Sequence, residues 1–105
     1  MSEKTLELLA DALAERVQAD PSVSYTAALL AGAPDSILRK IAEEAGETII
    51  AGKGGSDAEV VHEIADLWYH TLVLLVARGL SPADVLAELD RRSGTSGHAE
   101  KAARG

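Results

Sequence analysis

The 105-residue sequence contains no cysteine, no phenylalanine and only three prolines. Without cysteine the chain forms neither disulfides nor thiolate metal sites. The apolar residues are mainly Ala, Leu, Ile and Val, and together with abundant Glu and Arg they favour helices over strands. One domain with a modest core fits this length, and two do not. We therefore expect a single all-α domain.

Basic residues are also scarce, and long hydrophobic runs are missing. Residues 1–90 hold six Lys or Arg against sixteen Asp or Glu, and the whole chain carries a formal net charge of -7. A basic surface for nucleic acid is therefore not expected. The longest uncharged apolar run, residues 67–77, is too short to cross a bilayer, and the N-terminus does not have the pattern of a signal peptide. We expect a cytoplasmic protein that contacts neither nucleic acid nor membrane.

Apolar residues recur at helical spacing along four segments, with a further short helical turn possible at residues 24–31. The glycine-rich turn 52–55 is predicted to end the second helix, and Gly79 to cap the third. The predicted helix starts are about Thr5, Asp35 (as N-cap), Ser56 (in a capping box) and Pro82. The helical domain thus covers residues 1–92, and the Gly- and Ser-rich composition of 93–105 predicts a disordered tail.

The third predicted helix is apolar nearly all round in its second half, which is typical of the central helix of a bundle. Four helices of this kind predict a four-helix bundle-like protomer. Such a protomer leaves one apolar face of the central helix uncovered, so we expect a homodimer in which a second copy buries it.

Acidic residues are concentrated on the second and third predicted helices. Positions three or four apart share a helix face, so Glu44 points with Glu47, and Glu63 points with Asp66. Like charges at this spacing repel each other, and a carboxylate beside the core needs a compensating cation. Asp66 is flanked by apolar residues, which makes at least one of the four carboxylates a neighbour of the core.

A helical hairpin brings the two acidic pairs to matching height, because both lie at similar distances from the glycine-rich turn. Packed helix axes about 8–10 Å apart then allow the carboxylates to converge. Mg²⁺ is the cation that suits such a cluster, since it takes oxygen ligands and keeps waters that substrate phosphates replace. The alternative is that each pair describes a solvated helix face, as such spacings usually do.

Several neighbouring residues have candidate roles. Glu43 lies about 100° around the helix from Glu44, which places it at the rim of the cluster, where it could anchor a lysine or a partner subunit. Lys40 precedes Glu44 by four residues, and His70 follows Asp66 by four, which places both near the acidic cluster as candidates for substrate contact. The alternative for His70 is a hydrogen-bonded core histidine. Lys53 in the glycine-rich turn is a candidate for phosphate contact or a solvated lysine. His62 is expected at the surface.

The acidic residues match a known pattern, in which EExxE (Glu43, Glu44 and Glu47) is followed on the next helix by ExxD (Glu63 and Asp66). This pattern resembles that of the all-α nucleotide pyrophosphohydrolases, a MazG-like superfamily that includes MazG-type enzymes and dimeric dUTPases. Within this superfamily, the stretches 24–26, 37–45 and 65–75 closely resemble the phosphoribosyl-ATP pyrophosphohydrolase family. The resemblance extends over residues 5–92.

The resemblance implies Mg²⁺-dependent hydrolysis of phosphoribosyl-ATP to phosphoribosyl-AMP and pyrophosphate in histidine biosynthesis. Metal ligation then falls to Glu44, Glu47, Glu63 and Asp66, and Glu43, at the rim of the cluster, is assigned to the attacking water. Tyr25 and Thr26, in one of the matching stretches, are candidates for substrate contact. Two other interpretations stay open at this point. A nucleoside triphosphate pyrophosphohydrolase of the MazG or dUTPase type would use the same carboxylates with another base pocket, and a non-catalytic helical interaction module would release no pyrophosphate.

Overall fold

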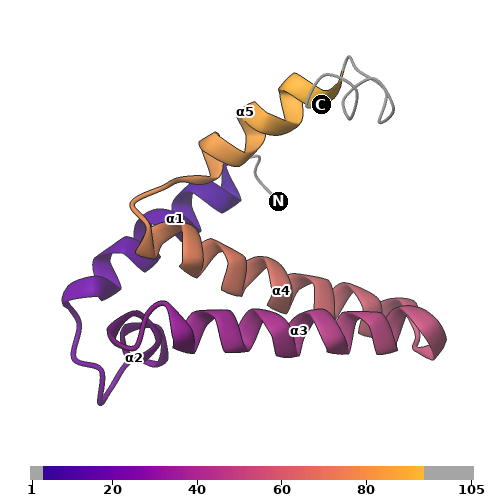
Figure 1. The fold of residues 1–105 in the computed structure, drawn as a ribbon, viewed down its shortest axis with the longest axis horizontal. Helices are drawn as coiled ribbons and strands as arrows, with labels where there is room; N and C mark the ends of the chain where they lie inside the picture. The colour runs from indigo at the N-terminus through magenta and orange to yellow at the C-terminus, as the bar shows by residue number, and fades with distance from the viewer. Residues whose placement is uncertain (1–3, 94–105) are drawn as a thin grey trace.

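The computed structural model describes residues 4–93, and between these residues it contains helices and no strand (Figure 1). The expected all-α class is thereby confirmed. The elements are α1 (Thr5–Glu15), the 3-10 turn η1 (Arg16–Gln18), α2 (Tyr25–Ala31), α3 (Asp35–Gly54), α4 (Asp57–Ala77) and α5 (Pro82–Ser93). Most of the predicted tail, residues 94–105, lies outside the described residues.

Helices α3 and α4 form an antiparallel hairpin that is the longest feature of the molecule (Figure 1). The predicted capping box starts α4: Ser56 Oγ accepts the Glu59 N–H at 3.2 Å, and Glu59 Oε1 accepts the Ser56 N–H at 3.4 Å. The glycine-rich turn is shorter than predicted, because α3 continues through Gly54. Of the glycines in this turn, only Gly55 has to be a glycine, since a Cβ atom at this position would lie 2.9 Å from the Ala51 carbonyl oxygen.

The N-terminal helices cover the open end of the hairpin (Figure 1). The first predicted helix is α1, followed by the 3-10 turn η1, and the possible turn at 24–31 is the helix α2. Ser24 caps α2, because its hydroxyl oxygen accepts the Ala27 N–H at 3.1 Å. The predicted N-cap Asp35 is instead the first residue of α3. Side chains from α1, α2, α3 and α4 make the buried core: Ala10, Leu13, Leu29, Ile37, Leu72 and Val73.

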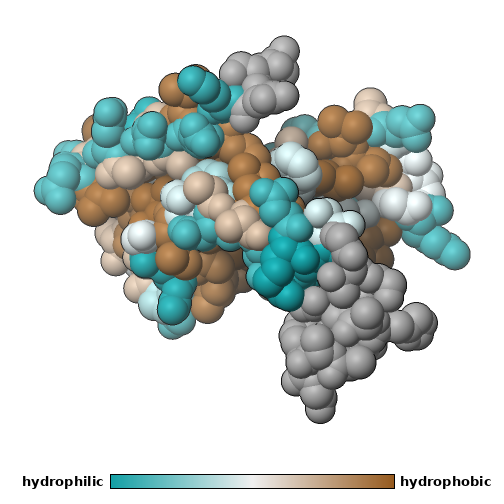
Figure 2. Space-filling view, turned by 90° about the horizontal axis from the view of Figure 1, so that it is seen from above, coloured by the Kyte–Doolittle hydropathy of each residue, from teal (hydrophilic) through white to brown (hydrophobic). Residues whose placement is uncertain are grey.

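Helix α5 packs beside α1 and extends away from the hairpin (Figure 1). Within one chain the arrangement is therefore a two-helix hairpin with α1 and α2 at one end, rather than four helices packed along their full lengths. An apolar groove of about 450 Å³ opens between α4, α5 and α1. Figure 2 shows apolar residues exposed over broad parts of one face of the molecule.

Helix α4 is unusually apolar for a helix with so much free surface. By length and composition it could cross a membrane, with a mean hydropathy of 1.3 over 18 residues, although the core helix of a soluble protein passes the same test. Only 17% of that window is buried within the chain. Trp68, which lines the groove, is 60% exposed. The single chain thus leaves a large apolar face of its central helix uncovered.

Candidate metal centre

The hairpin brings together the four predicted carboxylate ligands. Helix α3 supplies Glu44 and Glu47, and α4 supplies Glu63 and Asp66. Ligand atoms of Glu44, Glu47 and Glu63 all lie within 4.8 Å of one another, and a second group with the same spacing contains Glu63 and Asp66. Glu63 belongs to both groups. The cluster could therefore hold a metal ion.

Glu44 is the most deeply placed member of the cluster. Its side chain is 8% exposed, and its Oε2 has no hydrogen-bond partner among residues 4–93. Glu63 Oε2 is likewise buried without a partner in this part of the chain. A buried carboxylate oxygen without a partner is costly, and ligation of a cation is one way to remove that cost. The donors are oxygens, which hard divalent cations prefer, so the residues fit such an ion.

Two of these carboxyl groups are easier to protonate than ordinary glutamates. Burial, followed by the neighbouring carboxyls of Glu47 and Asp66, raises the pKa of Glu44. The adjacent Glu47 carboxyl, which would share a proton with protonated Glu63, is the first cause that raises the pKa of Glu63, and burial is the second. Both shifts express the same difficulty, which is that negative charge accumulates where water is partly excluded. Protonation and metal binding are alternative ways to relieve it.

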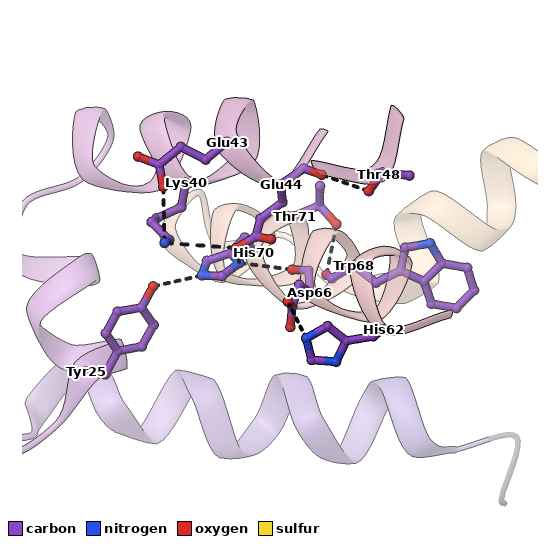
Figure 3. A network of polar contacts seen from close by, with 10 residues as sticks. All are labelled: Tyr25, Lys40, Glu43, Glu44, Thr48, His62, Asp66, Trp68, His70 and Thr71. Carbon is purple, nitrogen blue, oxygen red and sulfur yellow. Dashed lines mark hydrogen bonds and ion pairs between the residues drawn. The ribbon is translucent and has the colours of Figure 1, made fainter. Parts of the chain in front are cut away.

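Lys40 provides a cation at the edge of the cluster. Its Nζ lies 3.2 Å from Glu43 Oε2 and 4.0 Å from Glu44 Oε1 (Figure 3). The hydrogen bond with Glu43 is the main reason that the pKa of Lys40 is raised. The predicted closeness of Lys40 to the cluster is confirmed, and Glu43 lies at the rim beside it. One lysine does not offset four carboxylates.

His70 links α4 to α2 next to Glu44. Its Nδ1 lies 2.9 Å from the Asp66 backbone oxygen, and its Nε2 lies 2.9 Å from the Tyr25 hydroxyl (Figure 3). A carbonyl oxygen only accepts, so Nδ1 donates to it, and in the neutral ring Nε2 accepts from Tyr25. Glu44 Oε1 lies 3.7 Å from the same Nδ1. His70 is therefore a buried neighbour of the cluster with both ring nitrogens engaged.

Thr26 and Lys53 lie away from the carboxylates. Thr26 is buried, and its hydroxyl oxygen lies 2.6 Å from the Tyr69 hydroxyl oxygen. Lys53 is exposed in the last turn of α3, and nine residues separate it from Glu44, which places it on roughly the opposite side of the helix. Of the five candidate substrate residues, the structure brings Lys40, Tyr25 and His70 to the cluster's edge.

His62 joins the cluster, a position that the sequence interpretation did not assign to it. The predicted exposure is confirmed, since its side chain is 71% exposed, but its Nε2 also lies 3.3 Å from Asp66 Oδ2. His62, Glu63 and Asp66 form the second group of donors within 4.8 Å of one another. The signal was present in the sequence: His62 precedes Asp66 by four residues, which is the spacing that places two side chains on one face.

Free space adjoins the carboxylates toward the closed end of the hairpin. A cavity of about 470 Å³ is bounded on one side by two members of the cluster, Glu47 and Glu63. Its remaining lining residues are Ile50, Ala51, Gly54, Gly55 and Glu59. A ligand held at the carboxylates therefore has room to extend along this end of the hairpin.

Comparison with known proteins shows a similarity over nearly the whole chain. The family model for phosphoribosyl-ATP pyrophosphohydrolase matches residues 6–93. The phosphoribosyl-ATP pyrophosphatase of Geobacter sulfurreducens is 54% identical over 99 residues, which cover 94% of this chain and 92% of that protein. The enzyme of the same name from Neisseria gonorrhoeae is 48% identical over 104 residues, or 99% of this chain and 97% of the relative. That of Methylococcus capsulatus is 52% identical over 99 residues, with 94% of each chain covered.

The raised pKa values predict how the metal-free protein responds to pH. Unfolded Glu44 and Glu63 titrate near the ordinary value of 4.5, and their folded pKa values are higher. Between the unfolded and folded pKa values, the folded state therefore binds more protons than the unfolded state. The stabilisation that these protons give is complete below about pH 4.5, and it is lost as the pH rises through the folded pKa values. In excess EDTA, as the pH rises above about 4.5, we expect the Tm of Glu44→Gln to fall less than the Tm of the unmodified protein.

Thermal denaturation at a series of pH values measures this difference. Glu15→Gln, a substitution of an exposed glutamate at the end of α1, is the matched control and should follow the unmodified protein. Equal pH dependence in Glu44→Gln and the unmodified protein would contradict the prediction.

Proposed function

Since this chain belongs to the phosphoribosyl-ATP pyrophosphohydrolase family, hydrolases of histidine biosynthesis, we propose that its carboxylate cluster binds Mg²⁺ and cleaves phosphoribosyl-ATP to phosphoribosyl-AMP and pyrophosphate. The family match over residues 6–93 and the names of the relatives support the reaction. The observation that carries the site assignment is the buried Glu44 carboxylate, which has one oxygen without a hydrogen-bond partner in the described chain and lies in one group of donors with Glu47 and Glu63.

In the proposed site the carboxylates of Glu44, Glu47, Glu63 and Asp66 hold the metal. When bound, Mg²⁺ would neutralise the polyphosphate oxygens and stabilise the negative charge that develops on the departing pyrophosphate. The burial of Glu44 lowers the local dielectric constant, which strengthens the attraction between its carboxylate and a cation. The hairpin holds ligands from two helices in one place, so little reordering is needed when the ion and substrate bind.

Glu43 is the proposed acceptor of a proton from the attacking water. It lies beside the metal ligands but at the rim, where half of its side chain is exposed and a water can reach it. Lys40, 3.2 Å away, fixes the position of the Glu43 carboxylate. The other role for Glu43 is to hold Lys40 in place for contact with a substrate phosphate. The two roles predict different kinetic defects.

The side of the cluster that faces α2 is the proposed substrate-binding surface, and the cavity beside Glu47 and Glu63 gives the substrate further room toward the closed end of the hairpin. Lys40 carries the positive charge on the side that faces α2, and the Tyr25 hydroxyl lies next to it on α2 (Figure 3). Burial is the main cause that raises the pKa of Tyr25, so its hydroxyl keeps its proton and donates to His70. We propose that Lys40, Tyr25 and His70 shape the surface that meets the substrate. Lys53 and Thr26 have the positions of a solvated lysine and a core hydroxyl, respectively.

We further propose that the protein is a soluble, cytoplasmic homodimer. The uncovered apolar face of α4 and the groove beside Trp68 need a partner in water, and a second copy of the chain offers the same apolar face in return. A bilayer is a poor partner for α4, because Glu63 and Asp66 lie near its middle and carboxylates there are expensive in hydrocarbon.

The reaction is tested with purified protein, Mg²⁺ and phosphoribosyl-ATP, with identification of both products. We expect phosphoribosyl-AMP and pyrophosphate, and we expect Asp66→Asn to be folded by circular dichroism but at least about a hundredfold slower. Good turnover of dUTP or dCTP without turnover of phosphoribosyl-ATP would instead assign the chain to another branch of the superfamily. Release of no pyrophosphate from any nucleotide would leave a non-catalytic helical module.

The role of Glu43 is tested by comparing Glu43→Gln with Glu44→Gln. Loss of a proton acceptor should lower kcat by about 100- to 10,000-fold and leave the Mg²⁺ concentration for half-maximal activity almost unchanged. Loss of the ligand Glu44 should raise that Mg²⁺ concentration as well as lower kcat. A Glu43→Gln enzyme with near-normal kcat ends the assignment of Glu43 to the water.

The dimer is tested by mass and by fluorescence. Light scattering should give about twice the chain mass of 10.9 kDa, and Trp68→Glu should shift the protein toward the monomer. Trp68 is the only tryptophan, so dilution of the unmodified dimer should move its emission to longer wavelength. Val23→Glu, at an exposed position before α2, is the control and should keep the dimer mass. A monomer mass at all concentrations rules the dimer out.

A further inference from the structure

One donor at the edge of the carboxylate cluster is a nitrogen. His62 lies on the same face of α4 as Asp66, one turn away, and its ring is directed at the Asp66 carboxylate (Figure 3). Ligand atoms of His62, Glu63 and Asp66 all lie within 4.8 Å of one another. Neither the proposed reaction nor the EExxE and ExxD pattern uses this imidazole.

The separation between His62 and Asp66 suits two ligands of one ion. Metal–ligand bonds of about 2.0–2.2 Å place two donors of one tetrahedral ion roughly 3 to 3.5 Å apart. A charge-assisted hydrogen bond between an imidazolium and a carboxylate is shorter, about 2.7–2.9 Å. The observed Nε2 to Oδ2 distance of 3.3 Å matches the first geometry better than the second.

A buried, unpartnered oxygen lies behind this group of donors. The group shares Glu63 with Glu44 and Glu47, and the Glu44 side chain is more than nine-tenths buried, with 8% exposed. Among residues 4–93, neither Glu44 Oε2 nor Glu63 Oε2 has a hydrogen-bond partner. The His62 group therefore shares Glu63 with a cluster that contains two buried oxygens without hydrogen-bond partners, and it is not an isolated surface ion pair.

We propose that His62, Glu63 and Asp66 form a metal position that prefers late first-row divalent ions such as Co²⁺ and Zn²⁺ over Mg²⁺. Imidazole nitrogen is a good ligand for these ions, and affinities rise along the first row toward copper. Mg²⁺ favours oxygen ligands and retained waters, so it gains little from His62. The inference rests on the proposed carboxylate metal centre, because Glu63 and Asp66 belong to both.

The position has a functional consequence for the enzyme. An ion held by His62 occupies Glu63 and Asp66, which the proposed reaction needs for Mg²⁺. Co²⁺ or Zn²⁺ should therefore compete with Mg²⁺ for the site rather than add to it. The exposure of His62 gives such an ion a direct route from solvent to its ligands, whereas Glu44 lies deeper between the helices.

Co²⁺ is the probe, because its visible absorption reports ligand type and geometry without any substrate. The full chain is titrated with Co²⁺ alone and with Mg²⁺ present, in parallel with His62→Gln and Ala58→Gln. Ala58 is exposed, lies one turn before His62 and belongs to neither donor group, so its variant carries the same new amide as a control. We expect His62→Gln to weaken Co²⁺ binding by about 10- to 100-fold, with altered bands, and Ala58→Gln to match the unmodified protein.

The same titrations separate this inference from the proposed function. Equal Co²⁺ affinity and spectra in the unmodified protein and His62→Gln overturn the role of His62, whatever Mg²⁺ does. A fall of the ratio of Co²⁺ to Mg²⁺ affinity in His62→Gln supports it. Failure of the unmodified protein to bind Mg²⁺ or to cleave phosphoribosyl-ATP overturns the proposed function instead, and the Co²⁺ comparison still decides the role of His62.

Discussion

The concentration of negative charge between α3 and α4 is the constraint on which the rest of the structure depends. Four carboxylates meet there, and Glu44 is buried among them with its Oε2 atom lacking a hydrogen-bond partner in the described chain. The pKa values of Glu44 and Glu63 are raised because these carboxyls are partly buried next to other carboxyls. Because these carboxylates repel one another, they do not stabilise the metal-free fold. A bound cation, as proposed for this site, would remove this repulsion and thereby stabilise the folded state.

Features far from the carboxylates serve to hold this unfavourable cluster together. The close turn at Gly55 and the Ser56 capping box fix where α3 ends and where α4 begins. They thereby fix the position along the hairpin at which the acidic pairs of α3 and α4 meet. Buried side chains such as Ile37 and Val73 hold the open end of the hairpin against α1 and α2. The hydrogen bond from Tyr25 to His70 then ties α2 to α4 one turn away from Asp66. Apolar burial at one end thus offsets charge repulsion in the middle.

Periodicity and turn chemistry were enough to predict the helices, and helical spacing was enough to predict which carboxylates converge. The predictions that differed from the structure depend on tertiary contacts. The end of α3 was placed too early because glycine weakens a helix locally, yet packing against α4 carries α3 through Gly54. The orientation of α5 is set by contact with α1, which no local pattern reveals. His62 was assigned to the surface correctly, but its contact with Asp66 depends on side-chain rotamers that spacing permits without requiring.

Helix α4 carries carboxylates on one face and exposed apolar side chains on the other. Asp66 faces the carboxylate cluster, while Trp68, two residues later and about 200° around the helix, faces away from it. The apolar residues on the Trp68 side give α4 a hydropathy close to that of a membrane helix, although the acidic side is incompatible with one. The two faces thus suit the two proposed roles, metal binding on one and burial against a second copy on the other. Because a helix keeps these faces apart, the two proposals are separable: a substitution on the Trp68 side should change association without removing a proposed ligand, and a substitution at Asp66 should remove a proposed ligand without exposing apolar surface.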